Sequence, residues 1–505
     1  TLHNTLFPYT TLFRSLMFRG VPCPSMGTEP GGGAPSPPDG ATDDGPSPPE
    51  DGGTRTETVA PLPPYPPDLG PPSLHVLRQM RDFFEFTERA HRAGDVIRTR
   101  RPGVGDDYHL AHPEHAKRIL LTERGRFRKS EDFRIAFGDG LLTVEGEEWR
   151  RQREALRPLF TRDSVRGYAD GMVEQVERRS GRWADGDRLD LQREFTGMTL
   201  DVLFATVLGR ELELDGDRRL REAAEGLHGW FVPTSYLLPP WVPTPSRRRF
   251  REAKAALQEE ADRLIAERRG DPPADPSEAE DLLSLLLGLR EAGAVDERHL
   301  TDERLRDQMV TVIFAGHDTT TTTLTFAFWA LANHTEVRER FHEEVDRLDG
   351  PPTVEDLGDL EVTEQVVTET LRLYPPVYAL PRVTTREFAV DGYRIPADSR
   401  VFLEIRNIQR DRRFFDAPER FRPSRWTGDL RRELHDFAYA PFGGGPRICI
   451  GREFALLEAK LALATIGREY ELYWIGENEP DGEPPVSPQM TLRMEEGGEF
   501  LVTER

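Results

Sequence analysis

The stretch FGGGPRICIG, from Phe442 to Gly451, constrains the fold of this chain more than any other feature. A lone cysteine is usually a small buried apolar side chain. Here the glycines ahead of Cys449 allow left-handed or very tight turns, so the loop can approach a ligand closely. The next residues, EFALLEAKLALATI, have helical spacing, and the positive end of that helix together with Arg447 favours a thiolate. The stretch therefore predicts a loop that aims one sulfur at a metal cofactor carrying carboxylates.

Composition excludes several classes of function. The 505-residue chain has a formal net charge of -22, so nucleic acid is not an expected partner. Its two cysteines, Cys23 and Cys449, lie in different surroundings and make no disulfide framework, which favours a reduced, cytoplasmic setting. The sequence contains no apolar run of about 18 residues, so no transmembrane anchor is expected. These features predict an acidic, enzyme-sized protein.

Composition also divides the chain into three parts. Residues 1–16 include TLFPYTTLFRS (residues 5–15), which resembles the translation of a sequencing adapter, and we interpret them as an assembly scar. Residues 17–72 are rich in Pro, Gly and Asp and have too little apolar surface to offset chain entropy, so we predict a disordered extension. Residues 73–505 are the predicted folded domain.

Most of this domain has helical spacing. VIRTRR and DYHLAH read as a strand pair, and strand-like pieces return in EFAVDGYRIP, RVFLEI and the C-terminal TLRMEEGGEFLVTER. The chain has no alternating strand–helix rhythm and no repeat of 20–50 residues. The predicted fold class is mainly α with small β-sheets.

A second unusual stretch is IFAGHDTTTTT, Ile313 to Thr323, inside a long apolar helix. Gly316 and a run of β-branched residues are poor choices for a helix interior, and Thr hydroxyls compete for backbone carbonyls, which bends or opens a helix. A buried carboxylate such as Asp318 is costly unless it is paired or used. The residues alone leave two readings open, a polar helix face or a chemical site.

Two pairs of residues are expected to share helix faces. Trp149 and Arg153 in WRRQR are four apart, so the indole N–H and the guanidinium can reach the same carboxylates. Glu369 and Arg372 in ETLRLYPPV are three apart. The E-x-x-R pattern also occurs in EDFR, EEWR and EALR, so it gains weight only from its position and its company.

These motifs together resemble the cytochrome P450 family. FGGGPRICIG matches the family's cysteine loop, F-x-x-G-x-R-x-C-x-G, at every fixed position, which are Phe442, Gly445, Arg447, Cys449 and Gly451. In that family the Cys thiolate is the axial ligand of haem iron. The resemblance implies a mostly helical P450 fold with a smaller β-rich region, haem b as the cofactor, and Cys449 as the iron ligand.

The resemblance also implies roles for the threonine-rich helix. The run matches the family's A/G-G-x-D/E-T segment, where Ala315 and Gly316 leave room for dioxygen over the iron. Thr319 would hydrogen-bond the bound oxygen, and Asp318 would help relay protons. His317 falls at the variable position, and we assign it no role.

Other motifs acquire roles in the same way. Trp149, Arg153 and Arg382 of ALPRVT would contact the haem propionates. Glu369 and Arg372 would pair with Arg420 of APERF and lock the fold.

The implied function is a haem-thiolate monooxygenase that inserts one oxygen atom of O2 into an apolar substrate, with fatty acids and terpenoids as the classes weakly indicated by YPPVYALPR. A haem-thiolate peroxygenase or peroxide-rearranging enzyme is one alternative, although such relatives tend to lose the Asp318–Thr319 pair, and a haem-based sensor is another. A flexible substrate lid is expected over SYLLPPWVPTP, residues 235–245.

Electrons would come from a separate ferredoxin or flavodoxin, because too few residues follow Cys449 for a reductase domain. This donor would dock on a positive face that includes Arg150, Arg151 and Arg452. A monomer is expected.

Overall fold

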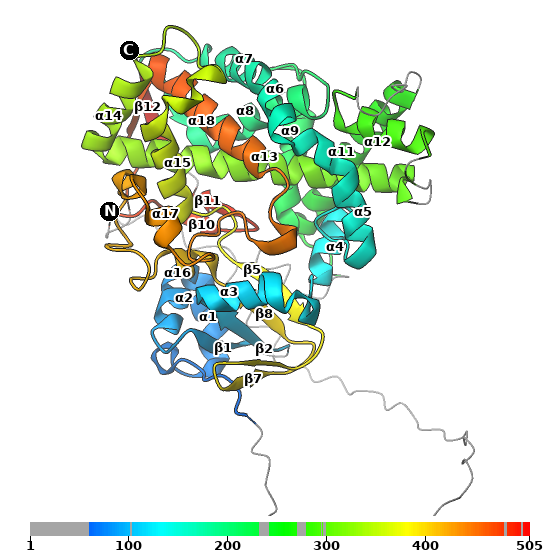
Figure 1. Cartoon of the computed structure of the whole chain (residues 1–505), viewed down its shortest axis with the longest axis vertical. Coiled ribbons are helices and arrows are strands. Elements are labelled where there is room, and N and C mark those ends of the chain that lie inside the picture. Colours follow the sequence, from blue (N-terminus) through cyan, green and yellow to red (C-terminus); the bar gives the residue numbers. More distant parts are fainter. Residues whose placement is uncertain are drawn as a thin grey trace, which may run out of the picture. The chain divides into compact units, whose positions relative to one another are not determined.

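A long central helix, α13 (Asp302–Asn333), runs through the folded unit and organises the helices around it (Figure 1). In this computed structural model the described residues are 60–101, 104–231, 242–269, 279–293, 295, 299–478, 482–495 and 498–505. The predicted lid segment at 235–245 lies mostly outside them, as do the predicted scar and most of the predicted extension. The described residues all belong to one unit, Val59–Arg505.

The α-helices confirm the predicted class. In chain order they are α1 (His75–Arg81), α2 (Phe83–His91), α3 (Pro113–Lys117), α4 (Glu131–Phe137), α5 (Gly146–Leu156), α6 (Arg162–Gly167), α7 (Ala169–Ser180), α8 (Leu191–Thr206), α9 (Arg218–Gly226), α11 (Pro245–Arg269), α12 (Leu282–Glu291), α13, α14 (Thr335–Val345), α15 (Glu361–Leu373), α16 (Ile405–Gln409), α17 (Leu430–Glu433) and α18 (Arg452–Glu469).

Short helical turns connect these helices. They are η1 (Pro67–Leu69), η2 (Pro72–Leu74), the π-helical η3 (Arg118–Thr122), η4 (Arg124–Arg126), η5 (Arg157–Phe160), η6 (Leu227–Trp230), η9 (Glu355–Gly358), η10 (Pro423–Trp426) and η11 (Gly445–Arg447).

The strands form small sheets, as predicted. They are β1 (Val96–Arg101), β2 (Gly105–Leu110), β3 (Phe127–Arg128), β4 (Arg188–Asp190), β5 (Leu380–Thr384), β6 (Phe388–Val390), β7 (Tyr393–Ile395), β8 (Arg400–Leu403), β9 (Tyr470–Trp474), β10 (Val486–Pro488), β11 (Leu492–Met494) and β12 (Glu499–Glu504). The largest sheet has the order β1-β2-β8-β5-β3, in which only β2 and β8 pair in parallel. A second sheet has the order β4-β12-β9, and β6-β7 and β10-β11 are hairpins.

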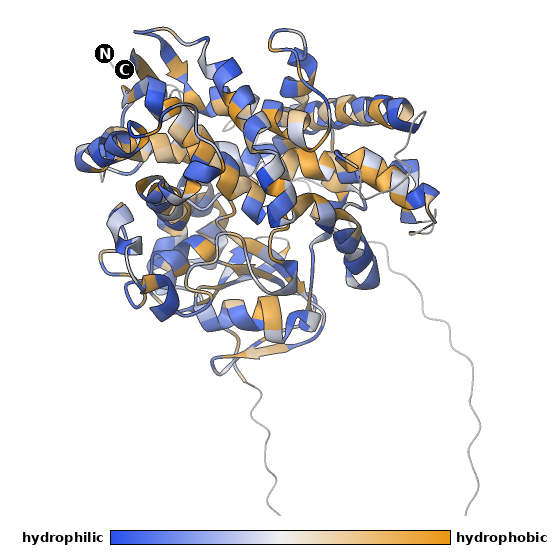
Figure 2. Ribbon diagram, turned by 45° about the horizontal axis from the view of Figure 1, so that its top comes forward, coloured by the Kyte–Doolittle hydropathy of each residue, from blue (hydrophilic) through white to orange (hydrophobic). Residues whose placement is uncertain are grey.

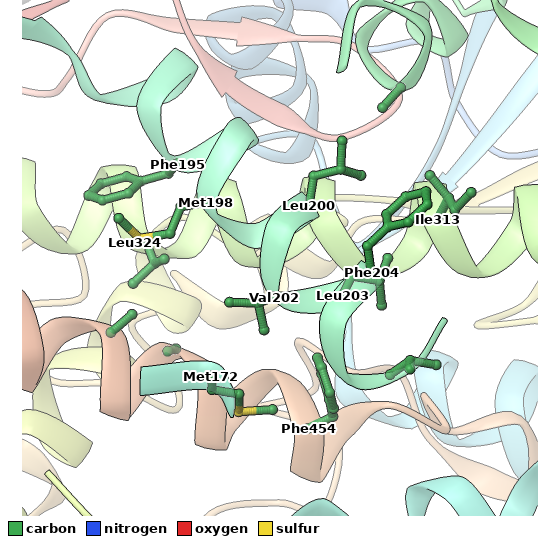
Figure 3. Close-up of a cluster of buried hydrophobic side chains, with 14 of the residues drawn as sticks. Met172, Phe195, Met198, Leu200, Val202, Leu203, Phe204, Ile313, Leu324 and Phe454 are labelled. Atoms are coloured by element: carbon green, nitrogen blue, oxygen red, sulfur yellow. The ribbon is translucent and has the colours of Figure 1, made fainter. Parts of the chain in front are cut away.

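The main hydrophobic core lies where α13 packs on α8 and α18, and α18 on α7. Figure 3 shows Phe195, Val202 and Leu203 of α8 among buried side chains of α7, α13 and α18. α8 is buried over almost its whole length, which a helix needs if it is to pack on more than one neighbour. Figure 2 shows the hydrophobic colouring along these central helices.

The folded unit begins before residue 73, the predicted boundary. Leu69 is buried, the N–H of Arg394 donates to the Pro61 carbonyl (2.9 Å), and the N–H of Arg98 donates to the Pro64 carbonyl (3.0 Å). Prolines lack an N–H but keep a carbonyl acceptor, so a proline-rich segment can lie against strands that have free donors. The proline-rich composition of this segment did not predict these contacts.

A buried ion cluster fixes α15 to the segment after α16. Arg372 donates to both carboxylate oxygens of Glu369 (2.8 and 2.9 Å), and both side chains are fully buried. The remaining Arg372 donors reach the carbonyls of Gln409 and Pro418. Burial alone would raise the pKa of Glu369, but the paired guanidinium groups hold it below its ordinary value.

The third member of this cluster is Arg425, and the prediction of Arg420 is wrong. Arg425 donates to Glu369 Oε1 (2.8 Å), and the indole N–H of Trp426 donates to Oε2 (2.8 Å). The exposed Arg420 provides only its backbone carbonyl, which accepts from Arg372 and from Arg425. The motif thus marks a turn that supplies a carbonyl, and the cation follows in η10.

Arg425→Met should destabilise the fold strongly, by about 3–5 kcal/mol, because Glu369 loses one of its two buried cations. Arg420→Met should cost less than about 0.5 kcal/mol, since an exposed side chain is removed and the carbonyl stays. Chemical denaturation of the two variants beside the wild type measures both values. Equal losses, or a larger loss for Arg420→Met, would contradict the assignment of Arg425.

Candidate active site

The cysteine loop precedes α18 and has the backbone geometry predicted for it. Gly443 and Gly445 have φ values of +71° and +65°. A Cβ on Gly445 would lie 2.2 Å from the carbonyl oxygen of Leu120, so a side chain is excluded there by both conformation and contact. The N–H of Cys449 donates to the Phe442 carbonyl (3.1 Å), which closes the loop.

The cations near the sulfur differ from the prediction. The Cys449 side chain is exposed, yet it lies deep among protein atoms, and this burial raises the pKa of its thiol. The N–H of Gly451, at the start of α18, and the charges of Arg153 and Arg452 act in the opposite direction. The thiolate therefore needs further positive charge, which a coordinated metal ion supplies.

Arg447 instead lies in a group of cationic side chains around Trp149 that also includes Arg382. We call this group the cationic cradle. Arg447 donates to the Val144 carbonyl (2.6 Å) and to Glu145 (3.3 Å). The Arg447 guanidinium lies 4.8 Å from the centroid of the Trp149 ring, and the Arg153 guanidinium lies 5.7 Å from the same centroid. The structure thus brings these predicted residues of α5 and the cysteine loop together.

Burial and the charge of Arg447 lower the pKa of Arg382, on β5, to about 10. Lys129 is a further member that the sequence analysis missed. Burial and the charges of Arg382 and Arg447 hold the pKa of Lys129 well below its ordinary value, and Glu145 opposes this shift. Lys129, Arg382 and Arg447 thus share one acidic neighbour, Glu145. The excess positive charge matches the two carboxylates of a haem group.

The threonine-rich segment remains α-helical throughout α13, so the helix does not open there. The hydroxyls of Thr319, Thr320 and Thr323 donate to the carbonyls four residues earlier (2.9, 3.3 and 2.9 Å), and the helical hydrogen bonds persist beside them. Ala315 is exposed and Thr319 partly exposed, whereas Phe314 is buried. α13 therefore presents one open face, formed by Ala315 and Thr319.

Gly316 is partly exposed, like Thr319, and it also lies against α8. A Cβ there would come within 2.9 Å of Leu203 Cδ1, so the glycine permits close packing of α13 on α8. The dioxygen-accommodating roles of Ala315 and Gly316 stay predictions.

Asp318 is fully buried, and its carboxylate is bound by three side chains. Oδ1 lies 2.9 Å from His228 Nε2 and 3.1 Å from Arg493 Nη1, and Oδ2 accepts from the hydroxyl of Thr491. Burial alone would raise the pKa of Asp318, but His228 and Arg493 hold it well below its ordinary value. Sequence reasoning found none of these partners, because η6 and β11 are far from α13 in the chain.

His317, to which the sequence analysis assigned no role, bonds to its own helix. Its Nδ1 lies 2.6 Å from the Ile313 carbonyl, and burial lowers its pKa to about 4. The ring is therefore neutral at physiological pH.

A protein-family model described as Cytochrome P450 matches residues 64–501. This chain belongs to the cytochrome P450 family. It is 34% identical over 410 residues to cyclooctat-9-en-7-ol 5-monooxygenase of Streptomyces melanosporofaciens, covering 79% of this chain and 87% of that protein. It is 33% identical over 420 residues to pentalenene oxygenase of Streptomyces avermitilis, covering 81% and 90%.

Solved structures support the same conclusion. The crystal structure of the cytochrome P450DA heme domain superposes with a TM-score of 0.74 at 28% identity, covering 88% of this chain and 98% of that chain. The predicted P450 fold is confirmed, and the chain is a cytochrome P450 monooxygenase.

The family implies a haem-thiolate centre, and the residues of this chain fit one. Across the described ranges, no group of three or more His, Cys, Asp or Glu side chains could hold a metal ion. Haem iron brings its other ligands with it, so a single protein thiolate such as that of Cys449 is sufficient to bind it. The cradle of Lys129, Arg382 and Arg447 supplies charge for the haem carboxylates. In the described part of the chain, no helix is long and apolar enough to cross a bilayer.

A second buried acid lies on α18. Glu458 is 1% exposed, and burial raises its pKa to about 8 against the lowering effect of Thr320. The Thr320 hydroxyl donates to the Gly316 carbonyl, and within the described residues neither Glu458 oxygen has a hydrogen-bond partner. The carboxyl is therefore mainly neutral at pH 7.

Because the pKa of Glu458 is raised on folding, the unfolded chain releases this proton near pH 4.5 while the folded chain keeps it until about pH 8. Between these values the folded state loses up to about 1.4 kcal/mol of stability per pH unit. Glu458→Gln should remove this loss, so thermal unfolding should show it more stable than the wild type at pH 8 and little changed at pH 5. The control is Glu453→Gln, on the same helix but 39% exposed, which should show no such trend. A difference that does not grow with pH would argue against a neutral Glu458.

Proposed function

We propose that this protein hydroxylates or epoxidises an apolar, terpenoid-like hydrocarbon, inserting one atom of O2 and using haem b held by Cys449. The observation that carries the proposal is that the chain has both a glycine-shaped cysteine loop and an open face on α13 at Ala315 and Thr319. The named activities of the relatives support the substrate class, since two of them are oxygenases of cyclooctat-9-en-7-ol and pentalenene.

The residues divide the work by position. Cys449 would bind the iron, and Trp149, Arg153, Arg382, Arg447 and Lys129 would hold the propionates. When bound, haem supplies the activation of dioxygen at its iron. The chain adds a fixed pocket wall and a route for protons. Fatty acids remain the second substrate class to test, on the weaker basis of YPPVYALPR.

Thr319 is the polar group on the open face of α13. Its hydroxyl donates to the Ala315 carbonyl (2.9 Å), which orients its oxygen as an acceptor and leaves the hydroxyl able to exchange that bond. A hydroxyl that can switch between a backbone carbonyl and a substrate-side acceptor is suited to pass a proton. Asp318, the next residue, points to the opposite, buried side, so it acts behind the face and not on it.

We propose that electrons come from a separate ferredoxin or flavodoxin that docks near the cysteine loop. The positive face expected there is partly neutralised. Arg150 pairs with Glu147 (2.5 Å), Arg151 lies 2.8 Å from His299 Nε2, and Arg452 lies 3.9 Å from Glu453. Docking would then depend on how an acidic partner competes with these glutamates, and salt should weaken it.

Thr319→Ala tests this function against a structural role. With a surrogate reductase, cyclic terpene hydrocarbons and ¹⁸O₂, the wild type should give products with one ¹⁸O atom. Thr319→Ala should bind haem normally but form roughly tenfold less product per NAD(P)H, because proton delivery is impaired.

The matched control is Thr323→Ala. Thr323 makes the same kind of bond, to the Thr319 carbonyl, but it is buried. It should keep wild-type coupling. Products without ¹⁸O, or equal coupling in the two variants, would refute the proposed function.

A further inference from the structure

The carboxylate of Asp318 lies in a buried cluster that no family motif describes. Its partners come from two distant elements, His228 from η6 and Thr491 and Arg493 from the start of the β11 strand. β11 is fixed to α13 at the same level, because the Thr322 hydroxyl donates to the Leu492 carbonyl (2.7 Å). The cluster is therefore held to α13 by two segments that are distant from this helix in the chain.

The ionised state of Asp318 poses a problem for a proton relay. A carboxylate bound by a guanidinium and an imidazole keeps its charge, so it has no proton of its own to give. If Asp318 relays protons, as the proposed function requires, a neighbour has to supply them. Of its three side-chain partners, only the imidazole of His228 has a nitrogen that can either carry or lack a proton, since a guanidinium and a hydroxyl serve here as donors only.

The geometry around His228 gives its ring two competing partners. Nε2 lies 2.9 Å from Asp318 Oδ1 and 2.8 Å from Arg493 Nη1. An arginine only donates and a carboxylate only accepts, so Nε2 must carry a proton for one partner and lack it for the other. The other ring nitrogen, Nδ1, is buried and has no hydrogen-bond partner within the described residues.

These two partners define two proton positions on the ring. When the ring is protonated on both nitrogens, Nε2–H donates to Asp318. When that proton moves to Asp318 Oδ1, the ring keeps its proton on Nδ1 and Nε2 accepts from Arg493. For the next cycle Nε2 takes a proton from a water molecule in place of its bond from Arg493, which restores the doubly protonated ring and needs no other co-reactant.

The exposed fractions of the three side chains fit proton transfer from His228 to Asp318. The side chain of Arg493 is 12% exposed, that of His228 7%, and that of Asp318 0%. Within the cluster, the side chain with the most solvent contact is therefore that of Arg493. Among the residues that the structure describes, the further titratable group beside Asp318 is His317, which stays neutral. The Phe314 ring covers His228, with ring centroids 5.2 Å apart.

We propose that His228 is the positioning residue that delivers protons from solvent to Asp318, and that Arg493 resets it after each transfer. This inference rests on the proposed function and extends it to η6 and β11. It assigns to His228 a role in coupling, while substrate binding and haem binding are left to other residues.

His228→Gln separates proton delivery from structure. A glutamine amide can donate to Asp318 and accept from Arg493 at the same time, so the cluster stays satisfied, but it does not titrate. We expect unchanged haem content and thermal stability in the holoenzyme. Product per NAD(P)H should fall about tenfold, less than the loss of a group that contacts the reactants. The solvent isotope effect should rise, and the pH dependence of coupling between pH 6 and 9 should flatten.

The matched control is His342→Gln, a histidine on α14 whose Nδ1 lies 3.0 Å from the Gly467 carbonyl, and it should behave like the wild type. A second readout does not depend on turnover. In the ferrous carbon monoxide complex of ¹⁵N-histidine-labelled protein, the His228 nitrogens should change their protonation with pH, and Arg493→Lys should shift that titration.

The outcomes distinguish this inference from the proposed function. If Asp318→Asn keeps full coupling, the relay role of Asp318 itself fails. If Asp318→Asn uncouples the enzyme but His228→Gln does not, only the inference about His228 fails. A His228 ring whose nitrogen shifts stay constant from pH 5.5 to 9 would also overturn it, even if the glutamine variant does not fold.

Discussion

The cysteine loop is held against neighbouring backbone so tightly that the rest of the site is arranged around it. Gly445 meets the Leu120 carbonyl at a distance that allows no side chain, and Arg447 is bonded to the Val144 carbonyl. These contacts tie the loop to η3 and to the start of α5, the helix that carries Trp149. The position of the sulfur relative to the cationic cradle is therefore fixed. A planar cofactor with carboxylates at one edge needs this fixed position, because its metal and its carboxylates are bound at the same time.

α13 places several polar side chains inside the hydrophobic core. Most of the helix is buried, and its threonine hydroxyls bond to the helix itself, so they cost little. Asp318 is the fully buried one of its four carboxylates, and His228 and Arg493 bind it on the buried side. The open face of Ala315 and Thr319 can then stay mainly apolar, which suits a hydrocarbon substrate.

Sequence patterns predicted the parts of the site that are local in the chain. The loop from Phe442 to Gly451 and the Glu369–Arg372 pair were found because their geometry is set by spacing within one segment. Arg425 was missed because the motif marks a turn whose carbonyl, not its side chain, enters the cluster. His228 and Arg493 lie 90 and 175 residues from Asp318, and no local pattern marks contacts of that range. The packed prolines at 61–66 were missed because composition does not show which carbonyls find donors.

The central claim is that Cys449 is the thiolate ligand of a haem iron. The most direct test is the absorption spectrum of the dithionite-reduced carbon monoxide complex, recorded for the wild type, Cys449→Ser and Cys23→Ser at equal haem content. The account predicts that the wild type and Cys23→Ser show the absorption band of thiolate-ligated haem and that Cys449→Ser has lost it. A Cys449→Ser protein that keeps this band would contradict the account.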